Sequence, residues 1–261
     1  MPLGTCRLCE KAGVELQKSH LMPAGLYSIT KGTDANPILI NHKTAVRTSR
    51  QVQAHLLCRD CEHRFNVGGE KWVIENCWRS ENQFPLQQGL LGAAPVAVDG
   101  ATRVYRAAAV PALRVEQFVY FGASVFWRAA VRRWGREDPG NIRFGIYEQP
   151  LRGYLLGERT FPDGMAMMIM ISASTTAVDN CMMSLPWLAG RRPIHKYRFD
   201  IPGVSYGLFV GKSAQTVARS GCAARYGTVV ITPEAERQRI QTARTVARNF
   251  SIKGKLRERR R

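Results

Sequence analysis

The chain has 261 residues, of which 45% are hydrophobic and 22% are charged. This composition is typical of a globular protein and excludes an intrinsically disordered chain, and no stretch reaches the roughly 18 consecutive apolar residues of a membrane-spanning helix. The formal net charge of +18, with a pI near 10.2, favours polyanionic partners. We therefore expect a soluble, cytoplasmic protein without a membrane partner.

The N-terminal part carries the four cysteines that form two C-x-x-C pairs, out of seven in the chain, and four of the five histidines. We assign residues 1–82 to a zinc-binding module and the Gly-, Pro- and Ala-rich residues 83–112 to a connector. Turn-forming residues and apolar runs predict the elements of the module. These are a loop over 30–37, a strand over 37–41 and a segment over 50–57 that leads into the second cysteine pair. A helical turn over 59–65 follows and, after a break at Gly68 and Gly69, a helix over 70–78.

Residues 115–134 have the periodicity of an amphipathic helix. Arg128, Arg132 and Arg133 are expected on the face opposite the apolar residues. A base-stacking surface would need exposed aromatic side chains, and the aromatic residues of this helix fall on its apolar side. We therefore assign no binding site to it.

The remaining apolar segments are typical of β-strands. Together they predict one antiparallel sheet, followed by a helix that Thr232 and Pro233 open and that extends to about residue 249. The predicted class is therefore α+β, with a mixed sheet-and-helix domain over 113–250 that is larger than the zinc module. The expected strands are 165–173, 196–201, 205–210 and 227–231.

The C-terminal end is strongly basic, because residues 237–261 contain ten lysines and arginines and one glutamate. Such a tail, over residues 251–261, can contact phosphates without reading sequence. The alternative is a solvated terminus that improves solubility. The candidate nucleic-acid-binding residues are Lys253, Lys255, Arg257, Arg259, Arg260 and Arg261.

Cys6, Cys9, Cys58 and Cys61 are predicted to bind one structural zinc ion. Two C-x-x-C pairs can complete a tetrahedron of thiolates, and an odd number of cysteines in a reducing compartment favours metal over disulfides. The alternative is that the pairs are unrelated turn cysteines. A site with four thiolates has no open position for substrate, so this ion would hold the fold. Cys77, Cys181 and Cys222 are expected to be small buried side chains.

Three motifs resemble the zinc-containing HNH endonucleases: Cys6-Arg-Leu-Cys9, Ser19-His20-Leu-Met-Pro23 and Leu56-Leu-Cys58-Arg-Asp-Cys61-Glu62-His63. The resemblance covers about residues 1–79. It implies a treble-clef-like fold of a β-hairpin and a helix held by the cysteine pairs. His20 matches the general base that activates water for attack on a phosphodiester.

The resemblance also implies a catalytic Mg²⁺ or Mn²⁺ ion, for which Glu62 or His63 could be a ligand. The residue before the general base is usually Asp or His in the family, and here it is Ser19, a poor ligand. The family's middle asparagine could be Asn36 or Asn41. His42 and His55 have no motif around them and are left out of the site.

Three functions follow from these patterns. The first is a metal-dependent endonuclease that hydrolyses phosphodiester bonds, with DNA expected as the substrate rather than RNA. The second is a non-catalytic, zinc-stabilised nucleic-acid-binding protein with a decayed nuclease centre, which the serine at position 19 favours. The third is a protein-interaction module. In the non-catalytic protein, His20 would only form hydrogen bonds within the hairpin. A solvent-open His20 that faces Glu62, His63 or Asn66 would favour the endonuclease.

Overall fold

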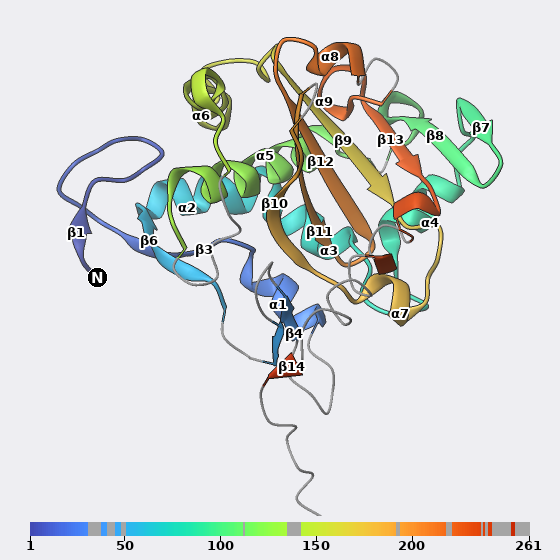
Figure 1. Cartoon of the computed structure of the whole chain (residues 1–261), viewed down its shortest axis with the longest axis horizontal. Helices are drawn as coiled ribbons and strands as arrows, with labels where there is room; N and C mark the ends of the chain where they lie inside the picture. Colours follow the sequence, from blue (N-terminus) through green and yellow to red (C-terminus); the bar gives the residue numbers. More distant parts are fainter. Residues whose placement is uncertain are drawn as a thin grey trace, which may run out of the picture.

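The computed structural model shows an α+β protein, as the sequence predicts. A mixed seven-stranded sheet and a long helix form the larger part, and a small cysteine-bearing module lies beside them (Figure 1). None of the described helices is long and apolar enough to cross a membrane. The structure describes residues 1–30, 38–40, 45–47, 51–111, 113–134, 142–191, 194–217, 221–235, 237, 240–241 and 252–253.

The N-terminal module contains a β-hairpin followed directly by a helix. Strands β3 (Gln17–His20) and β6 (Gln53–Leu57) pair antiparallel, with His20 opposite Gln53. Cys58 then caps helix α2 (Arg59–Phe65). The other elements of the module are β1 (Leu3–Gly4), β2 (Val14–Glu15), α1 (Ala24–Thr30), β4 (Ile38–Ile40), β5 (Ala45–Arg47), and β14 (Ile252–Lys253), which pairs with β5.

The helical stretch after Cys58 is continuous, whereas the sequence predicted a break at the two glycines. A π-helical turn, η1 (Asn66–Glu70), joins α2 to α3 (Lys71–Asn76). A Cβ atom on Gly69 would lie 2.5 Å from the carbonyl oxygen of Gln117 and 2.9 Å from the amide nitrogen of Phe121. The glycine is therefore needed for the close approach of another helix, and it does not end its own.

The sheet has the strand order β10-β11-β12-β9-β13-β8-β7. Neighbouring strands are antiparallel except β9 and β13, which pair in parallel. The prediction of an antiparallel sheet was therefore wrong for this pair, because β12 occupies one side of β9 and β13 reaches the other side after a crossover. The strands are β7 (Ala97–Asp99), β8 (Thr102–Arg106), β9 (Met165–Ile171), β10 (Ser184–Gly190), β11 (His195–Ile201), β12 (Val204–Val210) and β13 (Thr228–Ile231).

Sequence patterns found four of these strands and missed three. The strands β9, β11, β12 and β13 lie within or within one residue of the predicted segments. The edge strand β10 was missed because it contains Pro186 and irregular pairing, which an edge tolerates. The stretch 83–112, interpreted as a connector, contains β7 and β8 at the other edge. The shorter helical elements are α4 (Pro85–Leu91), η2 (Ala107–Ala109), η4 (Gly145–Tyr147), α6 (Glu148–Leu156), α7 (Ala177–Asn180), α8 (Ala214–Val217) and α9 (Ala223–Tyr226).

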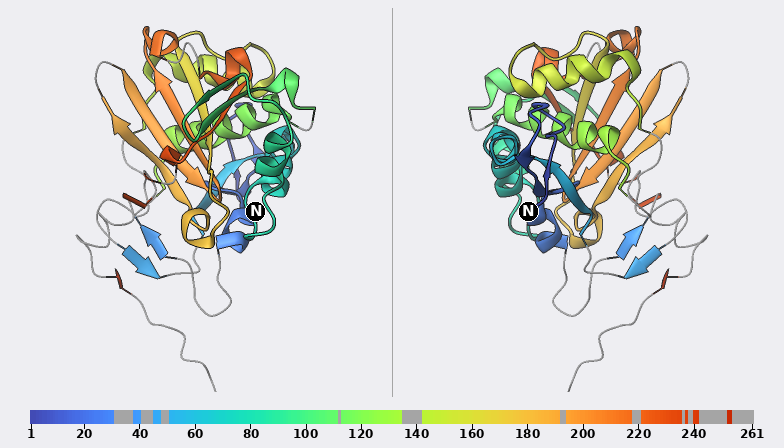
Figure 2. Two further views of the ribbon diagram at one scale, coloured as in Figure 1. Left: turned by 90° about the vertical axis from the view of Figure 1, so that its right-hand side faces the viewer. Right: turned by 90° about the vertical axis from the view of Figure 1, so that its left-hand side faces the viewer.

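The long helix α5 (Val115–Val131) confirms the predicted helix and ends three residues earlier. It lies between the sheet and the N-terminal helices, and Figure 2 shows the strands β9 to β12 as one layer with α2, α3 and α5 on one side of it. Phe121 and Phe126 contact the ring of Phe199 on β11. From the other side, Phe65 of α2 packs edge-on against Trp127. Buried side chains of the module and of the sheet therefore belong to one core.

Only part of the predicted C-terminal helix lies in the described residues. The amide of Glu234 donates a hydrogen bond of 3.2 Å to Oγ1 of Thr232, as expected of a helix N-cap. Residues 234, 235, 237, 240 and 241 are helical. The predicted loop over 30–37 also falls almost entirely outside the described residues.

Candidate metal centre and adjoining polar cluster

The sulfur atoms of Cys6, Cys9, Cys58 and Cys61 all lie within 4.8 Å of one another. Those of Cys9 and Cys58 are 3.8 Å apart. A tetrahedral zinc ion with Zn–S bonds of about 2.3 Å holds its sulfurs about 3.8 Å apart. The two predicted pairs therefore form one site that can hold a metal ion such as zinc.

Backbone hydrogen bonds shape the first cysteine pair. Glu10 has a left-handed backbone with φ of 59°, which closes the turn so that its amide donates to the Cys6 carbonyl at 2.9 Å. The turn is attached to the second pair, because the Cys58 amide donates to Sγ of Cys6 at 3.3 Å. On its other side, Arg152 of α6 forms an ion pair with Glu10 at 2.7 Å. Residues far along the chain therefore help to hold the metal site.

The thiols of the cluster influence one another. A hydrogen bond from Cys61 lowers the pKa of Cys6 to about 4, whereas the same contact and burial raise the pKa of Cys61. Burial, and then the Cys6 sulfur, raise the pKa of Cys58. Crowded thiolates repel one another, so they can all ionise together only with a cation among them. The donor set and its geometry therefore fit a divalent metal ion.

His20 is half-buried at the end of β3, where it is held by its surroundings. Burial lowers the pKa of its imidazole, a hydrogen bond with the side chain of Gln51 opposes that shift, and the positive charge of Arg128 lowers the pKa further. Its carbonyl oxygen accepts a hydrogen bond of 2.7 Å from Arg128. The lowered pKa favours the neutral form of the imidazole, which can accept a proton.

Ser19 and Glu62 face each other between β3 and α2. Burial raises the pKa of the Glu62 carboxyl, and the neighbouring Ser19 hydroxyl opposes this shift. Oγ of Ser19 and Oε1 of Glu62 are both buried and make no hydrogen bond of regular geometry with another described residue. Successive side chains of a strand point to opposite faces, so Ser19, rather than His20, lies on the side of Glu62. This differs from the arrangement expected of a catalytic His20, which would face Glu62.

Arg128 is a residue of this cluster that the sequence analysis placed wrongly. It was expected on an exposed face, yet only 1% of its side chain is exposed. Its guanidinium forms an ion pair of 2.5 Å with Glu70, donates to His20 and to Ser124, and lies over the ring of Phe65. The missed signal is helical spacing, because a residue three positions after Val125 lies on the same face as that buried valine.

The other predicted residues lie apart from the cluster or outside the described residues. His63 is exposed on α2. Lys253 lies in β14, while Lys255, Arg257, Arg259, Arg260 and Arg261 are outside the described part, as are Asn36, Asn41 and His42. Cys77 and Cys222 are buried as expected, and burial raises the pKa of Cys77 to about 12. The same expectation was wrong for Cys181, which is exposed.

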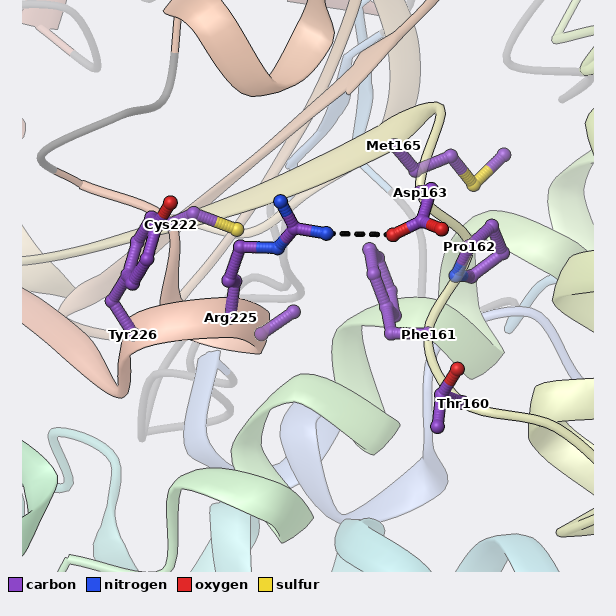
Figure 3. A pocket seen from close by; sticks show the side chains of 9 residues that line it. Thr160, Phe161, Pro162, Asp163, Met165, Cys222, Arg225 and Tyr226 are labelled. Carbon is purple, nitrogen blue, oxygen red and sulfur yellow. Dashed lines mark hydrogen bonds and ion pairs between the residues drawn. The ribbon is translucent and has the colours of Figure 1, made fainter.

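A separate hollow lies between the loop before β9 and helix α9 (Figure 3). Phe161, Met165 and the buried Cys222 line it. Arg225 reaches across it to form an ion pair of 2.6 Å with Asp163. None of its lining residues was singled out as a site residue from the sequence, and the ion pair accounts for the main charges at its mouth.

In comparisons with protein-family profiles, with characterised proteins and with solved structures, nothing matched the chain. The resemblance to HNH endonucleases therefore rests on the three short sequence motifs alone.

Proposed function

We propose that the chain is a zinc-stabilised endonuclease of the HNH type that hydrolyses phosphodiester bonds of nucleic acid, with His20 as the general base. The observation that carries the proposal is the junction of β3 and α2. There a half-exposed, neutral His20 follows Ser19, whose buried hydroxyl faces the carboxylate of Glu62. The cysteine cluster lies directly beside this junction, at Cys58 and Cys61.

Each group has a role in this proposal. The cysteine site would bind zinc as a closed site of four thiolates, which holds the hairpin to the helix and takes no part in the chemistry. The neutral imidazole of His20 would take the proton of the attacking water. Arg128 would position His20 through its carbonyl oxygen.

Glu62 would hold the Mg²⁺ or Mn²⁺ ion, with the weaker ligand Ser19 beside it, since each carries a buried oxygen without a regular hydrogen bond to another described residue. Mg²⁺ is commonly bound by one or two carboxylates together with water and substrate phosphate. When bound, such an ion stabilises the charge that develops on the phosphate and the leaving oxygen. His63 is a weaker candidate for the ligand, because it is exposed on the outside of α2.

The second candidate function is nucleic-acid binding without cleavage. One observation favours it: the guanidinium of Arg128 already forms an ion pair with Glu70 and donates to His20. A fixed cation at this place supplies the positive charge that a catalytic ion would bring, and it opposes the binding of that ion.

The test is cleavage of supercoiled plasmid and of single-stranded substrates by zinc-loaded protein with Mg²⁺ or Mn²⁺. His20→Ala is compared with His55→Gln, which changes another half-buried histidine, on the paired strand β6. Zinc content is measured for each protein. Metal-dependent cleavage that is lost only in His20→Ala supports the nuclease. Salt-sensitive binding without cleavage supports the second candidate, and neither binding nor cleavage overturns both.

A further inference from the structure

Exposed arginines gather where α5 ends and the edge of the sheet begins. A hollow at the end of α5 is lined by residues 129–133 together with Ile142 and Arg143. A second hollow is lined by Arg143, Leu188, Arg191, His195 and Tyr197. Because Arg143 borders both, the two hollows adjoin. We call this the α5-end surface, and its exposed basic residues are Arg132, Arg133, Arg143, Arg191 and His195.

Three arginines of this surface carry a charge that no described carboxylate neutralises, in contrast to the ion-paired arginines of the chain. Arg128, Arg152, Arg198 and Arg225 each form an ion pair with a carboxylate. In contrast, Arg133, Arg143 and Arg191 form no ion pair with any other described residue, and all three are exposed. The segment 135–141, which is outside the described residues, contains one arginine, one glutamate and one aspartate. Even when these charges are added, the net charge of the α5-end surface is positive.

Stabilisation of the helix terminus explains only part of this cluster. Basic side chains near a helix C-terminus interact favourably with its free carbonyl groups, and Arg7 donates to the Val131 carbonyl at 3.2 Å in this way. Arg143 and Arg191, however, come from other parts of the chain. The position of Arg143 is fixed, because the buried Tyr197 hydroxyl donates to its carbonyl at 2.7 Å. The surface is therefore assembled by tertiary structure, and the backbone of Arg143 is held in place before any partner binds.

The surface continues toward the hairpin that carries His20. Arg132 donates a hydrogen bond of 3.2 Å to the carbonyl of His55 on β6, the strand paired with β3. Earlier on the same helix, Arg128 donates to the His20 carbonyl. A chain of phosphates bound at the sheet edge would therefore run along the end of α5 toward β3 and β6.

We infer that the α5-end surface binds the sugar–phosphate backbone of nucleic acid and leads it to the hairpin of His20. Guanidinium groups from separate elements suit a row of phosphates, because each can donate two hydrogen bonds to one phosphate. Tyr197 is buried, and the described residues that line the two hollows include no exposed Phe, Tyr or Trp, so the surface contacts the backbone and does not read bases. The inference rests on the proposed action on nucleic acid and names the surface that binds it.

The test is the affinity of the full chain for a short fluorescent DNA duplex, measured by anisotropy over a range of salt concentrations without added Mg²⁺ or Mn²⁺. The variant Arg133→Gln/Arg143→Gln/Arg191→Gln removes three charges from the surface. The control variant Arg79→Gln/Arg103→Gln/Arg225→Gln removes three charges from exposed positions elsewhere, including β8 and α9. Circular dichroism and zinc content verify that both variants are folded.

The surface variant is expected to bind about tenfold more weakly or worse at low salt, with the slope of log K against log salt reduced by about 2 to 3, while the control changes by about twofold or less. Equal losses in the two variants, or tighter binding of the wild type to anionic vesicles than to DNA, would overturn the inference. Cleavage is measured separately. If the surface variant loses binding and the wild type does not cleave, the inference about the surface holds and the nuclease proposal fails. If the surface variant cleaves as well as the wild type, the nuclease proposal holds and the inference about the surface fails.

Discussion

The metal centre and the α5-end surface are assembled in opposite ways. The cysteines of the candidate metal centre come as two local C-x-x-C pairs, and folding brings the two pairs together. The basic residues of the α5-end surface come from a helix terminus, an irregular segment, the residue after β10 and strand β11. A site made of local pairs can be recognised from spacing. A surface made of single residues from separate elements has no pattern along the sequence.

Arginine shows the same contrast within one helix. Arg128 is buried with its donors used by Glu70, His20 and Ser124, whereas Arg132, one turn later, is exposed. The two differ in what packs on them, because α2 and η1 cover the middle of α5 and leave its end open. Burial, and not residue type, therefore separates the arginine that holds the fold from those that are free to bind a partner.

The largest effect is expected from loss of the metal. Removal of zinc by a chelator, or Cys58→Ser, should unfold the N-terminal module, since structural zinc sites contribute about 10–16 kcal/mol of binding free energy. Cys222→Ala, which changes a buried cysteine outside the metal site, should cost about 1 kcal/mol. Thermal unfolding with and without chelator measures both. If the chelator had no effect on unfolding, the cysteine cluster would not be a structural metal site.

The next effect should come from breaking the buried ion pair. Arg128→Met leaves Glu70 and the His20 carbonyl without their donor, and should lower the free energy of unfolding by about 3–5 kcal/mol. Arg132→Met, at the exposed end of the same helix, should cost less than about 1 kcal/mol. Urea unfolding of both zinc-loaded variants makes the comparison. Similar small losses in the two would mean that burial does not distinguish them.

A smaller effect is expected at the contact between η1 and α5. Gly69→Ala places a methyl group against the backbone of Gln117 and Phe121, so the helices must move apart at a cost of about 1–3 kcal/mol. The control is Gly92→Ala, where the nearest atoms lie 3.6 Å away and φ is −74°. Its free energy of unfolding should change by less than about 1 kcal/mol. Equal effects at the two glycines would show that the helices are not in close contact.

The smallest effect concerns the pH dependence of stability. The pKa of His20 is lowered from 6.5 in the folded protein, mainly by burial. As the pH falls through 6.5, the unfolded chain binds a proton that the folded chain does not, so stability decreases toward acid. The His20→Asn variant should lack this part of the decrease. The contribution of His20 is measured as the difference between the urea midpoints of the wild type and of the variant, followed from pH 8 to about pH 5. Protonation of the cysteines affects both proteins and cancels in that difference. A wild type that gained stability relative to His20→Asn toward acid would contradict the lowered pKa.

The sequence alone determined the features that depend on local spacing. The two C-x-x-C pairs predicted the ligand set, residues 115–134 predicted α5, and continuous apolar runs predicted four strands of the sheet. Each of these patterns repeats over a few residues, because a metal knuckle, a helix turn and a strand pleat each have a short period. The α+β class followed from them without any knowledge of contacts.

Only the tertiary structure decided which side chains meet. It placed Ser19 rather than His20 against Glu62, buried Arg128 beneath α2 and η1, made the glycine pair a close helix contact and set β13 parallel to β9. It also brought Arg143 and Arg191 to the end of α5. These outcomes depend on packing between segments tens of residues apart. Packing depends on the shape and charge of whole helix and sheet faces. The sequence of one segment does not specify the faces that pack against it.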